Sequence, residues 1–260
     1  MSLVTTERDG SIVILTLDRP DARNALSIEM CNDIVNALEE TDRDENARAV
    51  ILRGAGKTFC SGADFAAISG PGALDFLPAF ERMLEAVTRH RLPTIASIQG
   101  AALGGGLQLS MTCDFRIAAD DAKLGIPSSK LGILVNFENI QRLVLVAGIA
   151  VAKEVMLMGR TFSGAEGAEM GLINHSVTPP KLNDATLSLA SEIAERAPLS
   201  VQGAKRAIQL VVDHLAGART TSPNDVAAFD DAMAAAYNSL DLAKGLRAMT
   251  EKRPPDFSGT

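Results

Sequence analysis

Two glycine-containing loops hold the residues best suited to chemistry. The first spans residues 57–64 (KTFCSGAD), and the second spans residues 100–108 (GAALGGGLQ) at the expected start of a helix. Gly62 permits a tight turn that can aim consecutive backbone amides into a pocket. Glycines at a helix N-terminus leave N–H groups free to attract negative charge. One amide from each loop could hold a developing oxyanion; alternatively, the three glycines only allow close helix packing.

The elements that must position these loops alternate between strands and helices. Strands are predicted at residues 3–8, 12–17, 49–53, 94–98 and 115–118, and helices at 28–41, 73–91 and up to residue 112. This alternation predicts an α/β core over residues 1–197. Residues 198–260 are predicted to be helical with apolar faces, which favours a role of this region in oligomerisation.

Composition excludes some classes of protein. The chain has 260 residues, of which 47% are hydrophobic, so it can bury the core of one large domain. The net charge of −7 argues against a nucleic-acid-binding protein. A small anionic ligand stays compatible with it, because such a ligand needs only a few local positive groups.

The cysteines and the apolar runs indicate where in the cell the protein is located. The three cysteines are widely spaced, so they indicate neither a disulfide framework nor a metal site, and a reducing compartment is expected. The N-terminus lacks a basic segment followed by an apolar run, as a signal peptide would have. The longest apolar run, residues 143–152, is shorter than the roughly 20 residues of a membrane span. We therefore expect a soluble, cytoplasmic protein without membrane partners.

Four stretches of the chain resemble the crotonase, or enoyl-CoA hydratase/isomerase, superfamily. They are residues 18–26 (DRPDARNAL), 57–64, 93–118 (PTIASIQGAALGGGLQLSMTCDFRIA) and 251–257 (EKRPPDF). The likeness covers nearly the whole chain in the same order. It implies a crotonase-type spiral of ββα units with a C-terminal helical trimerisation region, and a homotrimer or hexamer. It also implies an acyl-coenzyme A as ligand, with no cofactor apart from the coenzyme A in the substrate.

The resemblance assigns roles to particular residues. It places the oxyanion donors at the backbone N–H groups of Ser61 and Gly105. Lys252 matches a lysine that reaches the coenzyme A phosphates, often from a neighbouring subunit. For Lys252, as for Arg23, the alternative is ordinary solvated surface charge. Further contacts with the coenzyme or the acyl group are expected at Ala22, Arg23, Ala25, Ala63, Asp64, Phe65, Gly104, Leu131 and Asn136.

The sequence departs from the hydratase pattern at two positions. Hydratases of this superfamily use two glutamates, and here Gln108 and Ser128 stand in their places. An amide takes up no proton at neutral pH, and a serine hydroxyl without a neighbouring base is inert. Each missing acid–base group is expected to cost about 10²- to 10⁴-fold in rate. Residues 135–139 (VNFEN) also replace a glycine-rich stretch, so a bulkier and more polar acyl pocket is expected.

Glu138 is the one nearby acid that could substitute. It lies ten residues after Ser128, in a stretch that lines the pocket of relatives, and could be a displaced acid. The alternative is a first-turn glutamate favoured by the helix dipole, with Asn136 as N-cap.

Three functions stay open from the sequence. The first is an enoyl-CoA hydratase or isomerase with weak hydratase activity. The second is another crotonase reaction, such as isomerisation, decarboxylation or thioester hydrolysis, that uses Glu138. The third is a binder or carrier of acyl-CoA without catalysis. The resemblance favours an enzyme, whereas Gln108 and Ser128 count against a hydratase.

Overall fold

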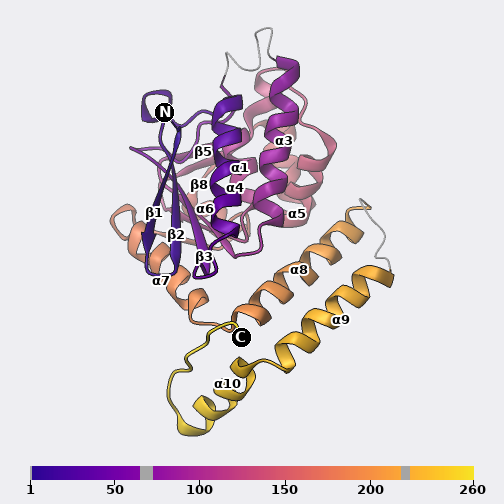
Figure 1. Cartoon of the computed structure of the whole chain (residues 1–260). Coiled ribbons are helices and arrows are strands. Elements are labelled where there is room, and N and C mark those ends of the chain that lie inside the picture. The colour runs from indigo at the N-terminus through magenta and orange to yellow at the C-terminus, as the bar shows by residue number, and fades with distance from the viewer. Residues whose placement is uncertain (1, 65–72, 218–222) are drawn as a thin grey trace.

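The chain folds into an α/β core followed by a helical C-terminal arm (Figure 1). The computed structural model describes residues 2–64, 73–217 and 223–260. The arm consists of α8 (Pro198–Leu215), α9 (Pro223–Tyr237) and α10 (Leu240–Glu251). The predicted class, an α/β fold with a helical C-terminal region, is confirmed. No helix in these described ranges combines the length and apolarity required to cross a membrane.

A six-stranded sheet forms the centre of the core. It begins with an antiparallel hairpin, β1 (Val4–Asp9) and β2 (Ile12–Leu17), which turns at Gly10 with φ 57°. The other strands follow β2 in parallel order as β3 (Ala49–Gly54), β4 (Thr94–Ile98), β6 (Phe115–Ala119) and β9 (His175–Val177). Every residue of β2 and β4 is buried, as expected for strands covered on both faces of a sheet.

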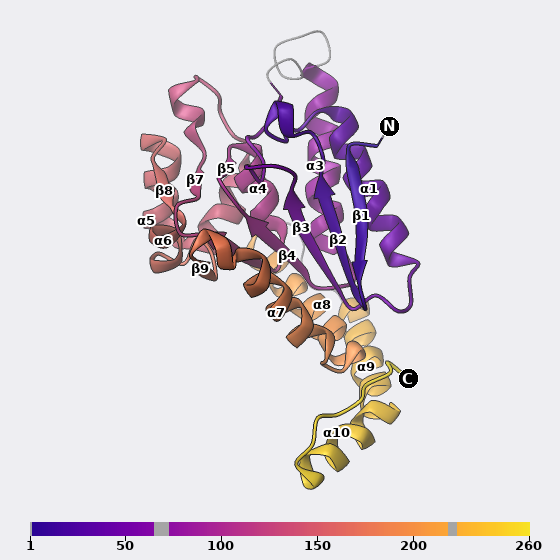
Figure 2. The same cartoon turned by 90° about the vertical axis from the view of Figure 1, so that its left-hand side faces the viewer.

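Helices cover both faces of this sheet. Helices α1 (Ile28–Asp42) and α3 (Ala73–Arg89) pack together on one face, and α7 (Leu182–Ala194) contacts β2, β3, β4 and β6 from the other (Figures 1 and 2). Ser27 caps α1 by accepting a hydrogen bond from the N–H of Met30. The predicted helix start at Ser27 is therefore confirmed, and α1 is fixed directly after the loop at residues 18–26.

A second, three-stranded sheet positions the glycine-rich segment. Strand β5 (Ala101–Leu103) pairs in parallel with β7 (Lys123–Gly125), which pairs antiparallel with β8 (Thr161–Ser163). The sequence predicts a loop at β5, because a three-residue strand is too short to show an alternating pattern. Since β5 ends just before α4 (Gly105–Thr112), the small sheet fixes where that helix begins.

The remaining elements belong to the core. They are the 3₁₀ turns η1 (Pro20–Ala22), η2 (Pro127–Lys130) and η3 (Pro179–Lys181), helix α5 (Phe137–Met158), which is interrupted at Gly148, and α6 (Gly164–Glu169). The chain end returns to the core, where Arg48 donates to the carbonyl of Ser258 at 3.1 Å. The arm exposes a row of large apolar side chains, which are Ile208, Val211, Leu215, Met233, Tyr237, Leu240, Leu242 and Leu246.

Candidate functional site

Two backbone N–H groups from different loops lie side by side at the start of α4. A Cβ added to Gly105 would lie 3.4 Å from the amide nitrogen of Ala63, and one added to Gly62 would lie 3.3 Å from the amide nitrogen of Gly105. Gly105 is the first residue of α4, so its N–H has no partner within the helix. In the described part of the chain, neither the Ala63 nor the Gly105 N–H has a hydrogen-bond acceptor.

The direction of the Ala63 N–H follows from the bond on the other side of its peptide. The carbonyl of Gly62 accepts a hydrogen bond from the N–H of Leu26 at 2.8 Å, and Asp64 donates to the carbonyl of Leu26 at 2.9 Å. In a trans peptide the C=O and N–H point in opposite directions. With the Gly62 oxygen held toward Leu26, the Ala63 N–H points away from it.

The structure corrects the expectation that the backbone N–H of Ser61 is an oxyanion donor. Its N–H donates to the carbonyl of Arg23 at 3.1 Å, so it holds two loops together instead of facing a ligand. We therefore assign the second free amide to Ala63, which the sequence predicted only as a contact of the substrate. The error has a physical reason, because which of the consecutive amides in KTFCSGAD points into the pocket depends on the pairing with Leu26, a long-range contact.

Glycines allow these loops to approach each other. Gly62 has φ 107° and Gly104 has φ 52°, both in the region that side chains with a Cβ rarely adopt. A Cβ on Gly106 would lie 2.2 Å from the carbonyl oxygen of Cys60. The alternative that the glycines serve close packing thus applies to Gly106, whereas Gly105 presents its amide.

The segment at residues 18–26 lies against the same loop. Ala22 is half-buried, Arg23 is exposed and Ala25 is buried. Arg23 and the buried Asn24 have φ values of 52° and 54°. The structure therefore brings the segment expected to contact coenzyme A next to Ala63 and Gly105.

Gln108 and Ser128 are both buried, each with 7% of its surface exposed. Gln108 lies one turn after Gly105 on α4, and Ser128 lies in η2. The pairing of β5 with β7 brings these segments together, since the N–H of Gly104 donates to the carbonyl of Gly125 at 2.8 Å. Among the described residues, neither side chain has a hydrogen-bond partner, and neither is a carboxyl group.

Glu138 lies elsewhere, in the first turn of α5. Asn136 caps this helix by accepting from the N–H of Asn139 at 3.2 Å. Glu138 is exposed and lines a groove of about 610 Å³ between α3, the C-terminal end of α4, α5 and α8. Neither Gly105 nor Gln108 lines this groove. This placement favours the interpretation of Glu138 as a helix-terminal charge.

The other residues predicted to contact the coenzyme or the acyl group do not all lie beside the two amides. Leu131, after η2, is 55% exposed. Lys252 directly follows α10, which lies at the end of the molecule remote from β5 and α4 (Figures 1 and 2). Asp64 pairs with Arg19 at 2.5 Å. Phe65 lies outside the described residues.

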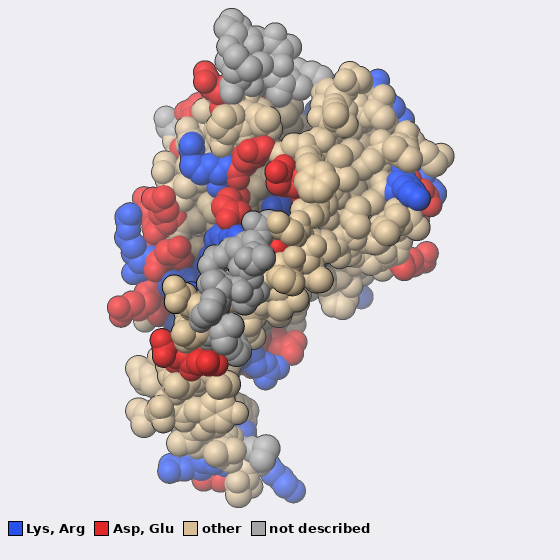
Figure 3. All heavy atoms as spheres, turned by 90° about the vertical axis from the view of Figure 1, so that its right-hand side faces the viewer, with Lys and Arg blue, Asp and Glu red and all other residues tan. Residues whose placement is uncertain are grey.

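The surface near α5 contrasts with that beside it. Figure 3 shows a broad uncharged area next to a band where acidic and basic side chains gather. Outside the arm, exposed large apolar residues gather in α5 and the segment before it, and they are Leu131, Ile133, Leu134, Phe137, Leu145, Ile149, Leu157 and Met158.

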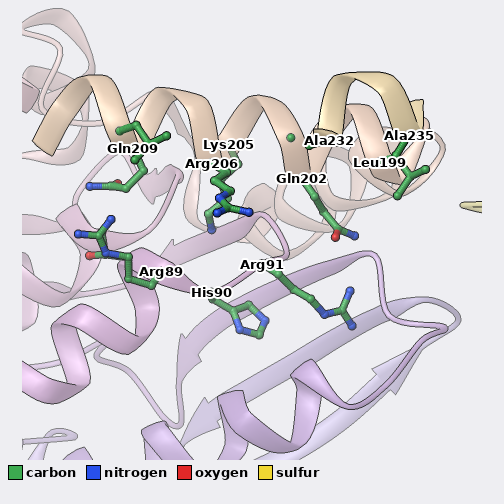
Figure 4. Close-up of a pocket in the computed structure, with 13 residues that line it drawn as sticks. Arg89, His90, Arg91, Leu199, Gln202, Lys205, Arg206, Gln209, Ala232 and Ala235 are labelled. Atoms are coloured by element: carbon green, nitrogen blue, oxygen red, sulfur yellow. The ribbon is translucent and has the colours of Figure 1, made fainter. Parts of the chain in front are cut away.

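A separate cavity of about 420 Å³ lies between α8, α9 and residues 88–91 (Figure 4). Lys205 and Arg206 reach from α8 toward Arg89 and Arg91. Arg89, Arg91 and Lys205 each form an ion pair with a carboxylate. Their charges are therefore largely compensated, and none of the residues predicted to form the acyl-CoA site lines this cavity.

His90 lies at the edge of this cavity and is only 3% exposed. Its Nδ1 lies 3.1 Å from a carboxylate oxygen of Asp42. Burial lowers the pKa of His90 to about 4, and the nearby charges of Lys205 and Arg91 also lower it, whereas Asp42 opposes the shift. The imidazole is therefore neutral at pH 7, with its Nδ1 beside the carboxylate of Asp42.

Lowering the pH from about 6.5 to about 4 is expected to destabilise the protein through His90. In this window the unfolded chain binds a proton that the folded chain does not, because the pKa falls from the ordinary 6.5 to about 4 on folding. Urea unfolding at a series of pH values should show that the free energy of unfolding falls less steeply with decreasing pH for His90→Asn than for the wild type. The difference in slope should correspond to at most one proton. Equal slopes for the variant and the wild type would contradict this assignment.

Comparisons with known proteins find a matching family model, similar sequences and a similar solved structure. Residues 7–260 match the family model described as enoyl-CoA hydratase/isomerase. An enoyl-CoA isomerase/hydratase, fer4, of Mycosarcoma maydis is 35% identical over 94% of this chain and 92% of its own length. A mitochondrial enoyl-CoA hydratase domain-containing protein 2 of Mus musculus is 34% identical over 98% of this chain and 86% of its own. The crystal structure of an enoyl-CoA hydratase/carnithine racemase from Magnetospirillum magneticum superimposes with a TM-score of 0.90 at 31% identity, covering 100% of this chain and 97% of that one.

Proposed function

The chain belongs to the enoyl-CoA hydratase/isomerase family, and we propose that it binds an acyl-coenzyme A with the thioester oxygen between the amides of Ala63 and Gly105. The observation that supports this most directly is the convergence of these two N–H groups from separate loops. Two such donors polarise a carbonyl and stabilise the oxyanion or enolate formed from it. The segment at residues 18–26 would hold the coenzyme, and no other cofactor is proposed.

The test is a complex with a non-reacting acyl-CoA such as butyryl-CoA. We expect the infrared carbonyl stretch of [1-¹³C]butyryl-CoA to fall on binding, because two hydrogen bonds weaken the C=O bond. A crystal structure of the complex should place the thioester oxygen within hydrogen-bond distance of Ala63 and Gly105. A thioester oxygen more than about 4 Å from both amides would overturn the proposal.

The proposed chemistry is limited by what surrounds the two amides. Gln108 and Ser128 offer no group that can take up a proton at neutral pH. We therefore propose binding and polarisation of the thioester with weak hydratase activity. An acyl-CoA binder, or a crotonase reaction that needs only the polarised carbonyl, is the second candidate, supported by the burial of both uncharged side chains beside the glycine-rich turn.

Replacing Glu138 by glutamine is expected to leave butyryl-CoA affinity and any turnover unchanged within about 2-fold. Glu138 lines a groove to which Gly105 and Gln108 do not contribute, so its carboxylate is not expected to contact the thioester. Isothermal titration calorimetry and a turnover assay with crotonyl-CoA would measure both quantities. A loss of turnover of 10-fold or more with unchanged affinity would restore Glu138 as the acid of a different crotonase reaction.

A homotrimer or hexamer is expected in solution. The arm exposes apolar residues on all three of its helices, and burial between subunits would remove that surface from water. The position of α10 far from α4 also means that Lys252 needs a neighbouring subunit to reach a coenzyme. Sedimentation at micromolar concentration should give a mass of three or six times 27.4 kDa. A monomer would contradict both the assembly and the role of Lys252.

A further inference from the structure

One arginine bridges the two loops that meet at the Ala63 amide. The Nη1 atom of Arg19 donates to a carboxylate oxygen of Asp64 at 2.5 Å and to the carbonyl of Ala25 at 3.4 Å. Ala25 and Asp64 are the neighbours of Leu26 and Ala63, which pair across the two loops. The guanidinium therefore ties the loops together beside the Leu26-to-Gly62 hydrogen bond that sets the direction of the Ala63 N–H.

The loop that carries Arg19 is held in an unusual backbone conformation. Arg23 and Asn24 have φ values of 52° and 54°, and this left-handed conformation costs free energy in residues other than glycine. Asn24 offsets this cost because its side chain accepts from the N–H of Arg19 at 3.0 Å and donates to the carbonyls of Ala55 and Thr58 at 3.0 and 2.7 Å. Asn24 thereby fixes the backbone from which Arg19 reaches Asp64.

We infer that Arg19 is a positioning residue for the Ala63 N–H, acting through Asp64 and the carbonyl of Ala25. The inference rests on the proposed function, because it assigns Arg19 to the polarisation of the thioester carbonyl. Arg19 touches no substrate atom in this scheme. Its guanidinium is partly buried, with 33% of its side chain exposed, and Asp64 is 20% exposed, so the pair is screened less than a surface ion pair.

A purely structural ion pair would have a different signature from a positioning one. Loss of a structural pair would lower stability, or weaken coenzyme binding through the loop at residues 18–26, but bound butyryl-CoA would keep its polarised carbonyl. Loss of a positioning pair tilts the Gly62–Ala63 peptide, so the carbonyl is less polarised even when every site is occupied. The carbonyl stretch at saturation therefore separates the two roles.

The experiment compares wild type with Arg19→Met, Arg19→Lys and Asp64→Asn. The infrared stretch of [1-¹³C]butyryl-CoA is measured at saturation, and affinities for butyryl-CoA and free coenzyme A are measured in parallel. Arg160→Met serves as the control, because Arg160 also forms ion pairs with carboxylates, with Glu154 at 2.6 Å and Glu166 at 3.3 Å. The double variant of Arg19→Met and Asp64→Asn completes a double-mutant cycle.

For Arg19→Met we expect about half of the carbonyl shift to be lost, since one of two donors is misplaced. Its affinity for butyryl-CoA should fall about 3- to 10-fold relative to free coenzyme A, the range expected for one hydrogen bond. Arg19→Lys should recover part of the shift, Arg160→Met should retain all of it, and the double variant should resemble Arg19→Met alone.

A full carbonyl shift in both Arg19→Met and Asp64→Asn would overturn the inference while leaving the proposed function intact. Absence of any shift in the wild type would overturn both. If Arg19→Met fails to fold, Asp64→Asn and Arg19→Lys decide the question, because each changes the pair while keeping polar groups in place.

Discussion

Replacing Gln108 and Ser128 by glutamate together is expected to raise the rate of crotonyl-CoA hydration by at least about 10²-fold. Both side chains are buried, one on α4 a turn after Gly105 and the other on η2. Hydration needs one group to activate water and another to protonate the α-carbon, and neither present side chain exchanges a proton at neutral pH. The gain also requires that residues 135–139 leave room for a water molecule.

The single variants provide the controls for this expectation. Gln108→Glu and Ser128→Glu alone should each give a smaller gain, because each restores one half of a cooperating pair, whose effects need not multiply. Ser128→Gln adds similar volume to Ser128→Glu without an acid and should give none. The rate is measured from loss of the enoyl absorbance. A wild-type kcat near the typical enzymatic value of about 10 s⁻¹ would show that other residues supply the acid and base.

Replacing Gly106 by alanine is expected to destabilise the folded protein by about 3 kcal/mol or more. The added Cβ would lie 2.2 Å from the carbonyl oxygen of Cys60 and 2.9 Å from its Cβ. Cys60 is fully buried, and its backbone forms hydrogen bonds with Ala101 and Leu103. Moving Cys60 away from the added Cβ would therefore break these bonds or disturb the core. Urea unfolding would measure the loss, together with the weakening of butyryl-CoA binding that follows a displaced α4.

Gly203→Ala is the matched control for this substitution. Gly203 lies inside α8, and a Cβ there would meet no atom within 4 Å. Alanine has the higher helix propensity, so this variant should be more stable by up to about 1 kcal/mol. If Gly106→Ala were as stable as Gly203→Ala, the close approach of α4 to the loop at Cys60 would be wrong.

Much of the core could be predicted from the sequence because its strands and helices are long enough to show periodicity. Strand β2, the Ser27 cap and the hairpin at Gly10 all follow from local patterns. Strand β5 could not be predicted in this way. It has three residues, and its existence depends on β7, more than 20 positions later in the chain.

The site shows the same division between local and long-range information. Gly105 could be identified as a donor position because a helix start after glycines is a local signal. Ala63 could not be distinguished from Ser61, since the choice depends on whether the Arg23 carbonyl or a ligand receives each N–H. The role of Arg19 could not be predicted from local sequence, because its partner Asp64 is 45 residues away along the chain.

The carbonyl groups behind the two donors give the site a further property. The Ala63 N–H shares its peptide with the Gly62 carbonyl, which accepts from Leu26, and the Gly105 N–H shares its peptide with the Gly104 carbonyl, which accepts from Gln108 at 3.1 Å. A peptide whose oxygen accepts a hydrogen bond shifts electron density toward that oxygen, which makes its own N–H a stronger donor. Both donors are thus strengthened by induction through the backbone, without a formal charge, so added salt should screen their pull on a carbonyl far less than it screens an ion pair.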